Sequence, residues 1–266
     1  MIKLVALDLD NTLLTNDKKI SKVNELALKK LSAKGVKVVL CTGRPINAIW
    51  HYIEQLGLTD PADFTITFNG ALVINNTSRK NLAKQGLSKT DLVPLHEFSK
   101  ANDFPLDILN FDQVYPITDL VKSTYQLGGG IKFEPMTFDE LPDQLYAKVV
   151  AAQKPAILDK MVAGLTPELK KQYHVARSQP HILEFLSPTT DKSVGLHALL
   201  QHFGWDESNL MAFGDAENDA GMLKSAEIGV AMANAQPAIT AMTKYHTGTN
   251  EEDGVAEFVD KYFKLD

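Results

Sequence analysis

The stretch Leu4-Val5-Ala6-Leu7-Asp8-Leu9-Asp10-Asn11-Thr12 near the amino terminus decides the fold class. Its first residues form an uninterrupted apolar run, which is typical of a strand buried on both faces of a parallel sheet. The run leads directly into an acidic cluster. In open α/β sheets, ligands bind beyond the carboxyl ends of the strands. The stretch therefore predicts a buried strand of a parallel sheet over residues 2–7 with a functional site at its end.

The segments on either side continue a strand–helix alternation. Buried strands are expected at residues 36–40, 65–68, 210–213 and 228–231. Helices are expected at residues 22–34, 45–57, 192–203, about 216–225 and 252–264. This alternation predicts a doubly wound, Rossmann-like α/β core domain.

The middle of the chain breaks that rhythm. Strands are expected within residues 106–118, with a possible turn at Asp112-Gln113, and at 146–152 and 181–186; helices are expected near 90–101 and 155–172. We interpret residues 83–187 as an inserted α+β domain, with 1–82 and 188–266 forming the core and linkers near 80–84 and 186–190. Gly128-Gly129-Gly130 is read as a surface loop in preference to a phosphate loop, because no strand–loop–helix context supports the latter.

Composition excludes several classes of function. The 266 residues are 44% hydrophobic and 23% charged, with a net charge of -6, which fits a globular protein and argues against a nucleic-acid partner. The single cysteine, Cys41, cannot form an internal disulfide. No signal peptide and no apolar run of about 18 residues is present, so we expect a cytoplasmic location and no membrane partner. The oligomeric state stays open.

Four polar segments follow predicted strands and are expected to converge: residues 8–12, 42–44, 69–70 and 214–219. If the chain is extended, Asp8 and Asp10 point to one side, where their repulsion calls for a cation or a shared proton. Together with Asp215 they supply the hard oxygen ligands that Mg²⁺ favours. Each acidic segment alone could instead be a turn or a helix cap.

Two further segments suggest recognition of an anion. Thr42, Gly43 and Arg44 precede a predicted helix whose amino-terminal N–H groups could bind a phosphate, although a simple Thr cap is equally compatible. Lys192 opens another helix, where the helix dipole disfavours a cation. An anionic partner would explain this lysine, but composition alone favours a solvated surface residue.

The motifs together resemble the haloacid dehalogenase (HAD) superfamily and its Cof-type phosphatase branch. The run Asp8-Leu9-Asp10-Asn11-Thr12 is similar to the first motif of that superfamily, and Thr42, Lys192 and Gly214-Asp215 with Asn218-Asp219 are similar to the other three. Four more segments resemble the Cof-type branch: Thr42-Gly43-Arg44-Pro45, Asn69-Gly70-Ala71, Ala231-Met232-Ala233-Asn234-Ala235 and Glu252-Asp253-Gly254-Val255. Ser193 is a departure from this pattern, because members of the Cof-type branch often have glycine directly after the lysine of the third motif. The inserted domain matches in length and placement only.

The resemblance implies a Mg²⁺-dependent phosphatase acting on a small phosphorylated metabolite such as a sugar phosphate. Asp8 would be the nucleophile and Asp10 the general acid and base. The implied metal ligands are Asp8, Asp10 (through its backbone carbonyl) and Asp215, with Asp219 orienting Lys192 or the waters on the metal. The implied phosphate-binding residues are Leu9, Thr42, Gly43, Lys192 and Asn218, and the possible substrate contacts are Arg44 and Asn69.

The inserted domain would act as a cap that closes over the site and selects the substrate. Within it, His181 and Glu184 are candidate contacts, although a position on the strand surface is the preferred interpretation of each. Two alternatives stay open: a phosphosugar mutase, which would share the first motif, and a non-enzymatic sensor of phosphorylated metabolites.

Overall fold

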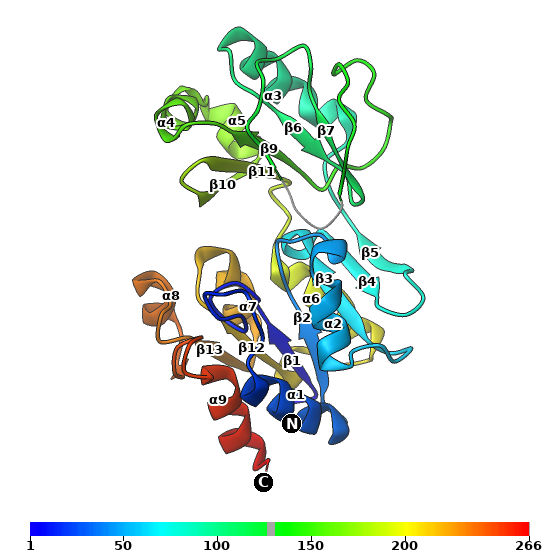
Figure 1. Ribbon diagram of the computed structural model, residues 1–266, viewed down its shortest axis with the longest axis vertical. Coiled ribbons are helices and arrows are strands. Elements are labelled where there is room, and N and C mark those ends of the chain that lie inside the picture. Colours follow the sequence, from blue (N-terminus) through cyan, green and yellow to red (C-terminus); the bar gives the residue numbers. More distant parts are fainter. Residues whose placement is uncertain (127–130, 266) are drawn as a thin grey trace. The chain divides into compact units, whose positions relative to one another are not determined.

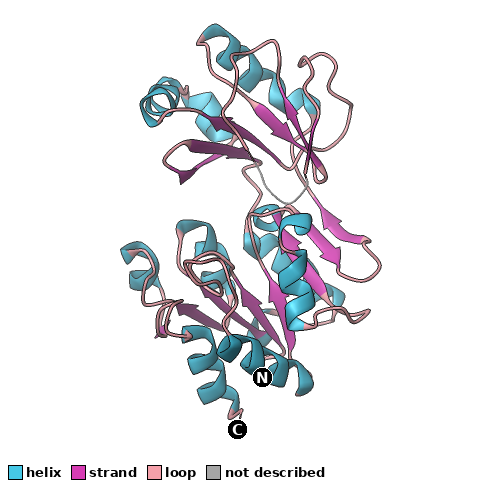
Figure 2. Cartoon of the chain, in the orientation of Figure 1, coloured by secondary structure: helices cyan, strands magenta, loops and turns pink. Residues whose placement is uncertain are grey.

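The computed structural model describes residues 1–126 and 131–265, so the predicted Gly128-Gly129-Gly130 loop lies outside the described residues. The chain divides into two compact units. Residues 1–84 and 191–266 form the core unit, and residues 85–190 form the inserted unit. Both contain helices and strands (Figure 2). Among the described residues, no helix combines the length and the apolar character needed to cross a bilayer.

A parallel five-stranded sheet forms the centre of the core unit (Figure 1). Its strands in spatial order are β14 (Tyr245–His246), β13 (Ile228–Ala231), β12 (Leu210–Gly214), β1 (Leu4–Leu7) and β2 (Lys37–Leu40). Leu4 pairs with Leu210 on one side and Lys37 on the other, which places β1 inside the sheet. All four residues of β1 are buried, so the predicted buried strand of a parallel sheet is confirmed.

Helices cover the sheet as expected for a doubly wound fold. They are α1 (Lys22–Ala33), α2 (Trp50–Leu56), α6 (Lys192–His202), α7 (Ala220–Ser225), α8 (Pro237–Met242) and α9 (Gly254–Phe263). Leu196 of α6 and Met222 of α7 pack with Leu4 and Ala212 of the sheet in one apolar cluster. Helices α1 and α9 are joined by Asn24, whose buried Oδ1 accepts the Ala256 N–H at 2.9 Å.

Two predicted elements of the core unit differ in detail. The third strand, β3 (Phe64–Thr67), belongs to an antiparallel sheet with β4 (Leu72–Asn75) and β5 (Asn81–Lys84). It is linked to the parallel sheet through a single bridge between Cys41 and Ile66. The helix predicted from Pro45 is a 3₁₀ turn (Ile46–Ala48) followed by α2, so no continuous α-helix starts beside Thr42.

The inserted unit is a six-stranded sheet with helices on one face (Figure 1). The strand order is β10 (His174–Gln179), β11 (Ile182–Leu186), β9 (Lys148–Ala152), β6 (Asp107–Leu109), β7 (Gln113–Pro116) and β8 (Lys132–Phe133). The helices are α3 (Lys89–Ala101), α4 (Pro155–Gly164) and α5 (Pro167–Gln172). The α/β core with an inserted α+β unit confirms the predicted fold class.

Alternate side chains of this sheet face the helices. Ile108, Val149 and Leu183 pack with Leu95 of α3 and Leu158 of α4. The sequence did not predict β8 and β10, which are short or largely exposed and therefore lack an apolar pattern.

The two candidate residues of the inserted unit lie in different surroundings. His181 is exposed in the turn between β10 and β11. Glu184 is buried and pairs with Lys148 at 2.7 Å, so the reading that places it on the strand surface is wrong. Successive residues of a strand point to opposite faces of the sheet. Glu184 therefore lies on the face opposite to the one on which Leu183 packs against the helices.

Candidate active site

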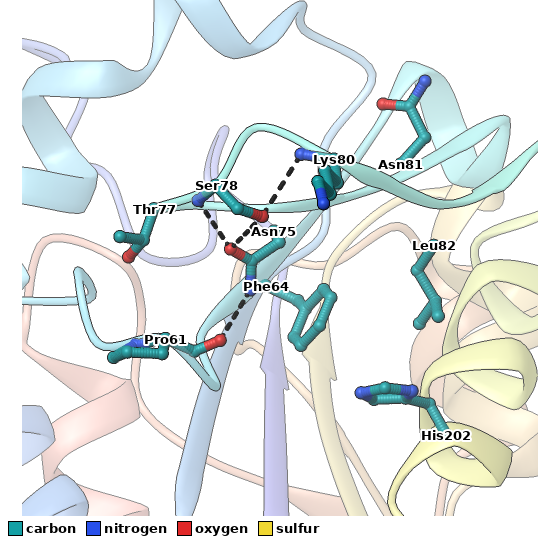
Figure 3. Close-up of a pocket in the computed structure, with 9 residues that line it drawn as sticks. All are labelled: Pro61, Phe64, Asn75, Thr77, Ser78, Lys80, Asn81, Leu82 and His202. Atoms are coloured by element: carbon teal, nitrogen blue, oxygen red, sulfur yellow. Dashed lines mark hydrogen bonds between the residues drawn. The ribbon is translucent and has the colours of Figure 1, made fainter.

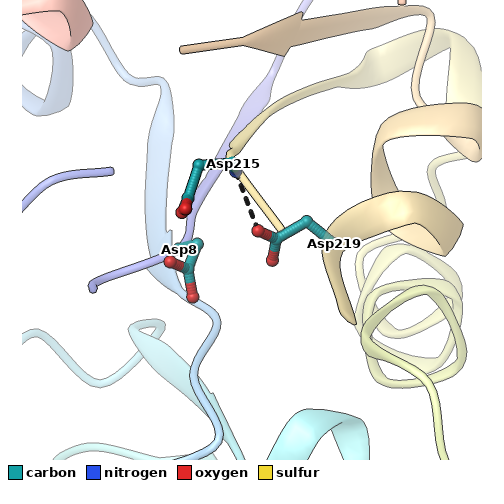
Figure 4. Close-up of side chains that lie close together, drawn as sticks. All are labelled: Asp8, Asp215 and Asp219. Carbon is teal, nitrogen blue, oxygen red and sulfur yellow. Dashed lines mark hydrogen bonds between the residues drawn. The ribbon is translucent and has the colours of Figure 1, made fainter. Parts of the chain in front are cut away.

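Three carboxylates converge beyond the carboxyl ends of β1 and β12 (Figure 4). Asp8 directly follows β1, and its N–H continues the ladder to the Phe213 carbonyl at 3.1 Å. Asp215 directly follows β12, and Asp219 comes from the 3₁₀ turn after it. One oxygen from each of these three aspartates lies within 4.8 Å of the others, and all three residues are buried. The parallel register thus joins segments that lie more than 200 residues apart.

Lys192 carries the positive charge of this cluster. Its Nζ donates to Asp8 Oδ1 at 2.5 Å and to Asp219 Oδ1 at 2.6 Å. Its side chain is completely buried, which rules out the solvated surface lysine that composition favoured. Two carboxylates therefore offset the unfavourable position of a lysine at the amino end of α6.

Burial and crowding shift the ionisation of these groups. Burial, and then the charge of Asp219, raise the pKa of Asp8 from 3.8 to about 8, although Lys192 opposes the shift. The same two causes raise the pKa of Asp215 to about 6, with Thr12 opposing. Burial would lower the pKa of Lys192, but Asp219 and Asp8 raise it, so its ammonium stays charged at neutral pH.

The donor set suits a divalent cation. When all four groups are ionised, three carboxylates face one ammonium, so two negative charges remain unbalanced in a buried site. Asp219 is the least available ligand, because Lys192 occupies Oδ1 and the N–H groups of Asp215 and Ala216 occupy Oδ2. Asp8 and Asp215 each accept a side-chain hydrogen bond at Oδ1, from Lys192 and Thr12 respectively. Hard, partly free carboxylate oxygens are the ligands that Mg²⁺ prefers.

Asp10 lies apart from this cluster. Its carboxylate accepts Arg44 Nε at 2.8 Å and Nη2 at 2.5 Å, and Lys18 Nζ at 2.8 Å. The chain turns directly after Asp8, so the extended geometry behind the expectation that the two side chains share one side does not continue to Asp10. The Asp8 carbonyl already accepts the Leu13 N–H at 3.3 Å. Burial would raise the pKa of Asp10, but the hydrogen bonds from Arg44 and Lys18 lower it overall.

The remaining predicted residues form a second group around Asn69. Thr42 is buried, and its Oγ1 accepts the Arg44 N–H at 3.1 Å. A Cβ on Gly43 would lie 2.9 Å from Asn69 Oδ1, so glycine permits this close approach. Asn218 donates to the same Asn69 oxygen at 3.2 Å. Asn69 itself has a left-handed backbone with φ 56°, which asparagine tolerates better than most residues.

Leu9 is completely buried between Asp8 and Asp10. Its carbonyl accepts the N–H groups of Thr12 and Leu14, which closes the turn after β1. The Leu9 side chain therefore anchors the turn in the core, and only its backbone could contribute to a phosphate site.

A pocket elsewhere in the core unit is unrelated to these groups (Figure 3). Its walls come from the start of β3, the turn between β4 and β5, the start of β5 and the end of α6. Phe64, the first residue of β3, lies in this wall, whereas the carboxylates lie beyond the carboxyl ends of their strands. The lining contains none of the predicted site residues. The candidate site is therefore identified by its carboxylate and lysine side chains and not by the position of this pocket.

Sequence reasoning missed two contributors. Lys18 lies in a loop, and no sequence signal connects it with Asp10. Thr12 belongs to the first motif, but the sequence predicts no role for it. Its hydroxyl donates to Asp215 Oδ1 at 3.0 Å from a completely buried position. A hydroxyl two residues after an acidic pair was the available signal.

Fold and site together define an α/β protein with a carboxylate–lysine centre at the carboxyl edge of its sheet. The family model for haloacid dehalogenase-like hydrolases matches residues 5–259. YxeH of Bacillus subtilis is 33% identical over 97% of each chain. The 5-amino-6-(5-phospho-D-ribitylamino)uracil phosphatase YitU of the same organism is 30% identical over 98% of each chain. A solved haloacid dehalogenase-like hydrolase from Bacteroides thetaiotaomicron gives a TM-score of 0.85 at 28% identity, covering 99% of this chain and 100% of that one.

The chain therefore belongs to the family of haloacid dehalogenase-like hydrolases, and the resemblance seen in the motifs is confirmed.

Proposed function

We propose that this protein is a Mg²⁺-dependent phosphatase that hydrolyses small phosphomonoesters through an aspartyl-phosphate on Asp8. The observation that carries the proposal is the buried Asp8–Lys192–Asp219 arrangement, with Asp215 beside it, in a chain of this hydrolase family. The relative YitU is named for a phosphorylated ribitylamino compound, which supports a small phosphorylated metabolite, such as a sugar phosphate, as the substrate class.

Asp8 is the proposed nucleophile. One of its oxygens forms a bond to phosphorus while the bond from phosphorus to the leaving alcohol breaks. Lys192 holds Asp8 at 2.5 Å and remains charged, so it can balance negative charge on the phosphoryl oxygens during transfer. Asp219 fixes Lys192 from its other side.

A Mg²⁺ ion bound by Asp8, Asp215 and the Asp10 backbone carbonyl would offset the repulsion between carboxylate and phosphate. Thr12 would orient Asp215 for that role through its hydrogen bond. Thr42, Gly43, Asn218 and the Leu9 backbone would hold the phosphoryl oxygens. The contacts of Asn69 with Gly43 and Asn218 keep part of this set together.

Asp10 is the proposed general acid and base. In the first step it gives a proton to the leaving alcohol, and in the second it takes a proton from the water that attacks the aspartyl-phosphate. Its contacts with Arg44 and Lys18 favour the ionised form, which suits the second step. The first step needs the protonated form, so we infer that Arg44 leaves Asp10 and turns to the substrate when the substrate binds.

The inserted unit is the proposed source of substrate selection. The bounds 83–187 expected from the sequence and the compact unit of residues 85–190 describe the same insertion. The cytoplasm is the proposed location, with neither nucleic acid nor membrane as a partner.

The test measures release of inorganic phosphate from p-nitrophenyl phosphate and from a panel of hexose and pentitol phosphates. Asp8→Asn is expected to abolish turnover with the fold intact, and so is chelation of divalent cations. Asp60→Asn makes the same chemical change at an exposed position and should keep full activity. Turnover by Asp8→Asn would contradict the nucleophile. An isomerised sugar phosphate without free phosphate would favour a mutase, and tight binding without any turnover would favour a sensor.

A further inference from the structure

Tyr52 contacts both residues that hold Asp10, although it does not itself touch that carboxylate. It lies near the start of α2 and is 3% exposed. Its hydroxyl donates to the Lys18 carbonyl at 2.6 Å. It also interacts with Arg44: burial would lower the pKa of that guanidinium, and Asp10 followed by Tyr52 raise it.

The hydrogen bond from Tyr52 restrains a turn that is otherwise exposed. Lys18 has a left-handed backbone with φ 59°, which is unfavourable for a lysine. Its N–H closes the turn on the Thr15 carbonyl at 2.8 Å, and its side chain is about half exposed. The Tyr52 hydroxyl thus connects helix α2 to Lys18, whose side chain reaches Asp10 from this turn.

We propose that Tyr52 is a positioning residue for the general acid and base, acting on Asp10 through Lys18. This inference rests on the proposed function, since it assigns Tyr52 a role in the proton transfers of Asp10. Proton transfer requires the acid within hydrogen-bond reach of the leaving oxygen, and misplacement by about 1 Å can cost about 100-fold in rate. Without the hydroxyl, the turn that contains Lys18 loses this restraint. The Asp10 carboxylate is then held less firmly in its orientation.

The test compares two leaving groups in Tyr52→Phe. An alkyl phosphate such as glycerol phosphate needs protonation of its leaving alcohol, whereas p-nitrophenol leaves readily as an anion. The value of kcat/KM reports the steps up to release of the alcohol, so it isolates the acid step. We expect kcat/KM to fall by about 10-fold for the alkyl phosphate and by less than about 3-fold for the aryl phosphate. A merely structural role would lower both values equally.

Two variants frame this result. Asp10→Asn should show the same selectivity for leaving group with a larger loss, about 100-fold or more on the alkyl phosphate. Thr247→Val removes another hydroxyl of the core unit that donates to a backbone carbonyl, that of Gly254 at 2.5 Å, and should leave the ratio of the two substrates unchanged.

The outcomes separate the two proposals. If Asp10→Asn shows no leaving-group effect, the assignment of Asp10, and with it the proposed mechanism, is wrong. If Asp10→Asn shows the effect and Tyr52→Phe lowers both substrates equally or neither, only the role of Tyr52 is overturned. Should Tyr52→Phe fail to fold, Lys18→Gln alters an exposed side chain in the same chain of contacts. It is expected to reproduce the leaving-group effect, and an unchanged ratio would overturn the proposal.

Discussion

Replacing Asp8, the proposed nucleophile, should make the protein more stable, because burial of this carboxyl costs folding free energy. The pKa of Asp8 rises from 3.8 to about 8, chiefly through burial and then through Asp219, and this value already includes the attraction of Lys192. A carboxyl whose pKa is raised in the folded state loses stability as the pH rises from the unfolded value towards the folded one. The fold therefore tolerates the neutral form of Asp8 and is destabilised by the ionised form.

The magnitude follows from the pH interval. Between the unfolded pKa of 3.8 and pH 7 lie about 3 pH units, each worth about 1.4 kcal/mol. Folding at pH 7 therefore costs at most about 4 kcal/mol at this residue, because Asp8 is largely protonated in the fold and ionised in the unfolded chain. Asp8→Asn does not titrate and keeps the shape of the side chain. We expect it to raise the free energy of unfolding at pH 7 by about 2–4 kcal/mol, and by less than half as much at pH 5.

Urea unfolding followed by tryptophan fluorescence provides the measurement. Both tryptophans, Trp50 and Trp205, lie in the core unit, so the signal reports the unit that contains Asp8. Chelator must be present, because a bound divalent cation would favour the carboxylate, and added Mg²⁺ should narrow the difference. Asp60→Asn is the matched control and should leave the free energy of unfolding unchanged. A variant no more stable than the parent at pH 7, or a gain equal at pH 5 and pH 7, would refute the reasoning.

Two further substitutions test the supporting contacts. Thr12→Val keeps the shape of the side chain but removes the 3.0 Å hydrogen bond to Asp215. The Mg²⁺ concentration for half-maximal activity should therefore rise about 10-fold or more. An unchanged Mg²⁺ dependence would show that Thr12 does not support the metal site. Gly43→Ala would place Cβ 2.9 Å from Asn69 Oδ1 and force the Asn69 side chain to move. The value of kcat/KM for p-nitrophenyl phosphate should therefore fall several-fold, while the melting temperature stays nearly constant. Unaltered kinetics would show that the position of Asn69 does not affect phosphate binding.

Much of the core could be predicted because its signals are local. The apolar run of β1, the glycine that ends α1 and the acidic residues after β12 each reflect packing or turn chemistry within a few residues. Gly35, for example, has φ 83°, as expected for a helix end. Convergence of Asp8 and Asp215 followed from the rule that parallel strands present their carboxyl ends at one edge.

The sequence could not predict turns and side-chain partners that depend on tertiary structure. Asp10 is two residues from Asp8, but the chain turns between them, and the Asp8 carbonyl accepts the Leu13 N–H in that turn. Its partners, Arg44 and Lys18, come from loops without periodicity. Likewise, the charge of Glu184 favours an exposed position, but Lys148 on the neighbouring strand allows its burial.

Unfavourable local features gather at the candidate site and are scarce along the strands that carry it. Lys192 is a buried cation at a helix amino terminus, Asn69 has a left-handed backbone, and Asp8 is a buried carboxylate beside two others. None of these helps the sheet to fold, since β1 and β12 are apolar and regular up to the residue before each carboxylate. Local rules are most often broken at functional sites, where the surrounding structure offsets the cost. The stability expected from Asp8→Asn measures that cost directly, which is why the same substitution should stabilise the fold and abolish the reaction.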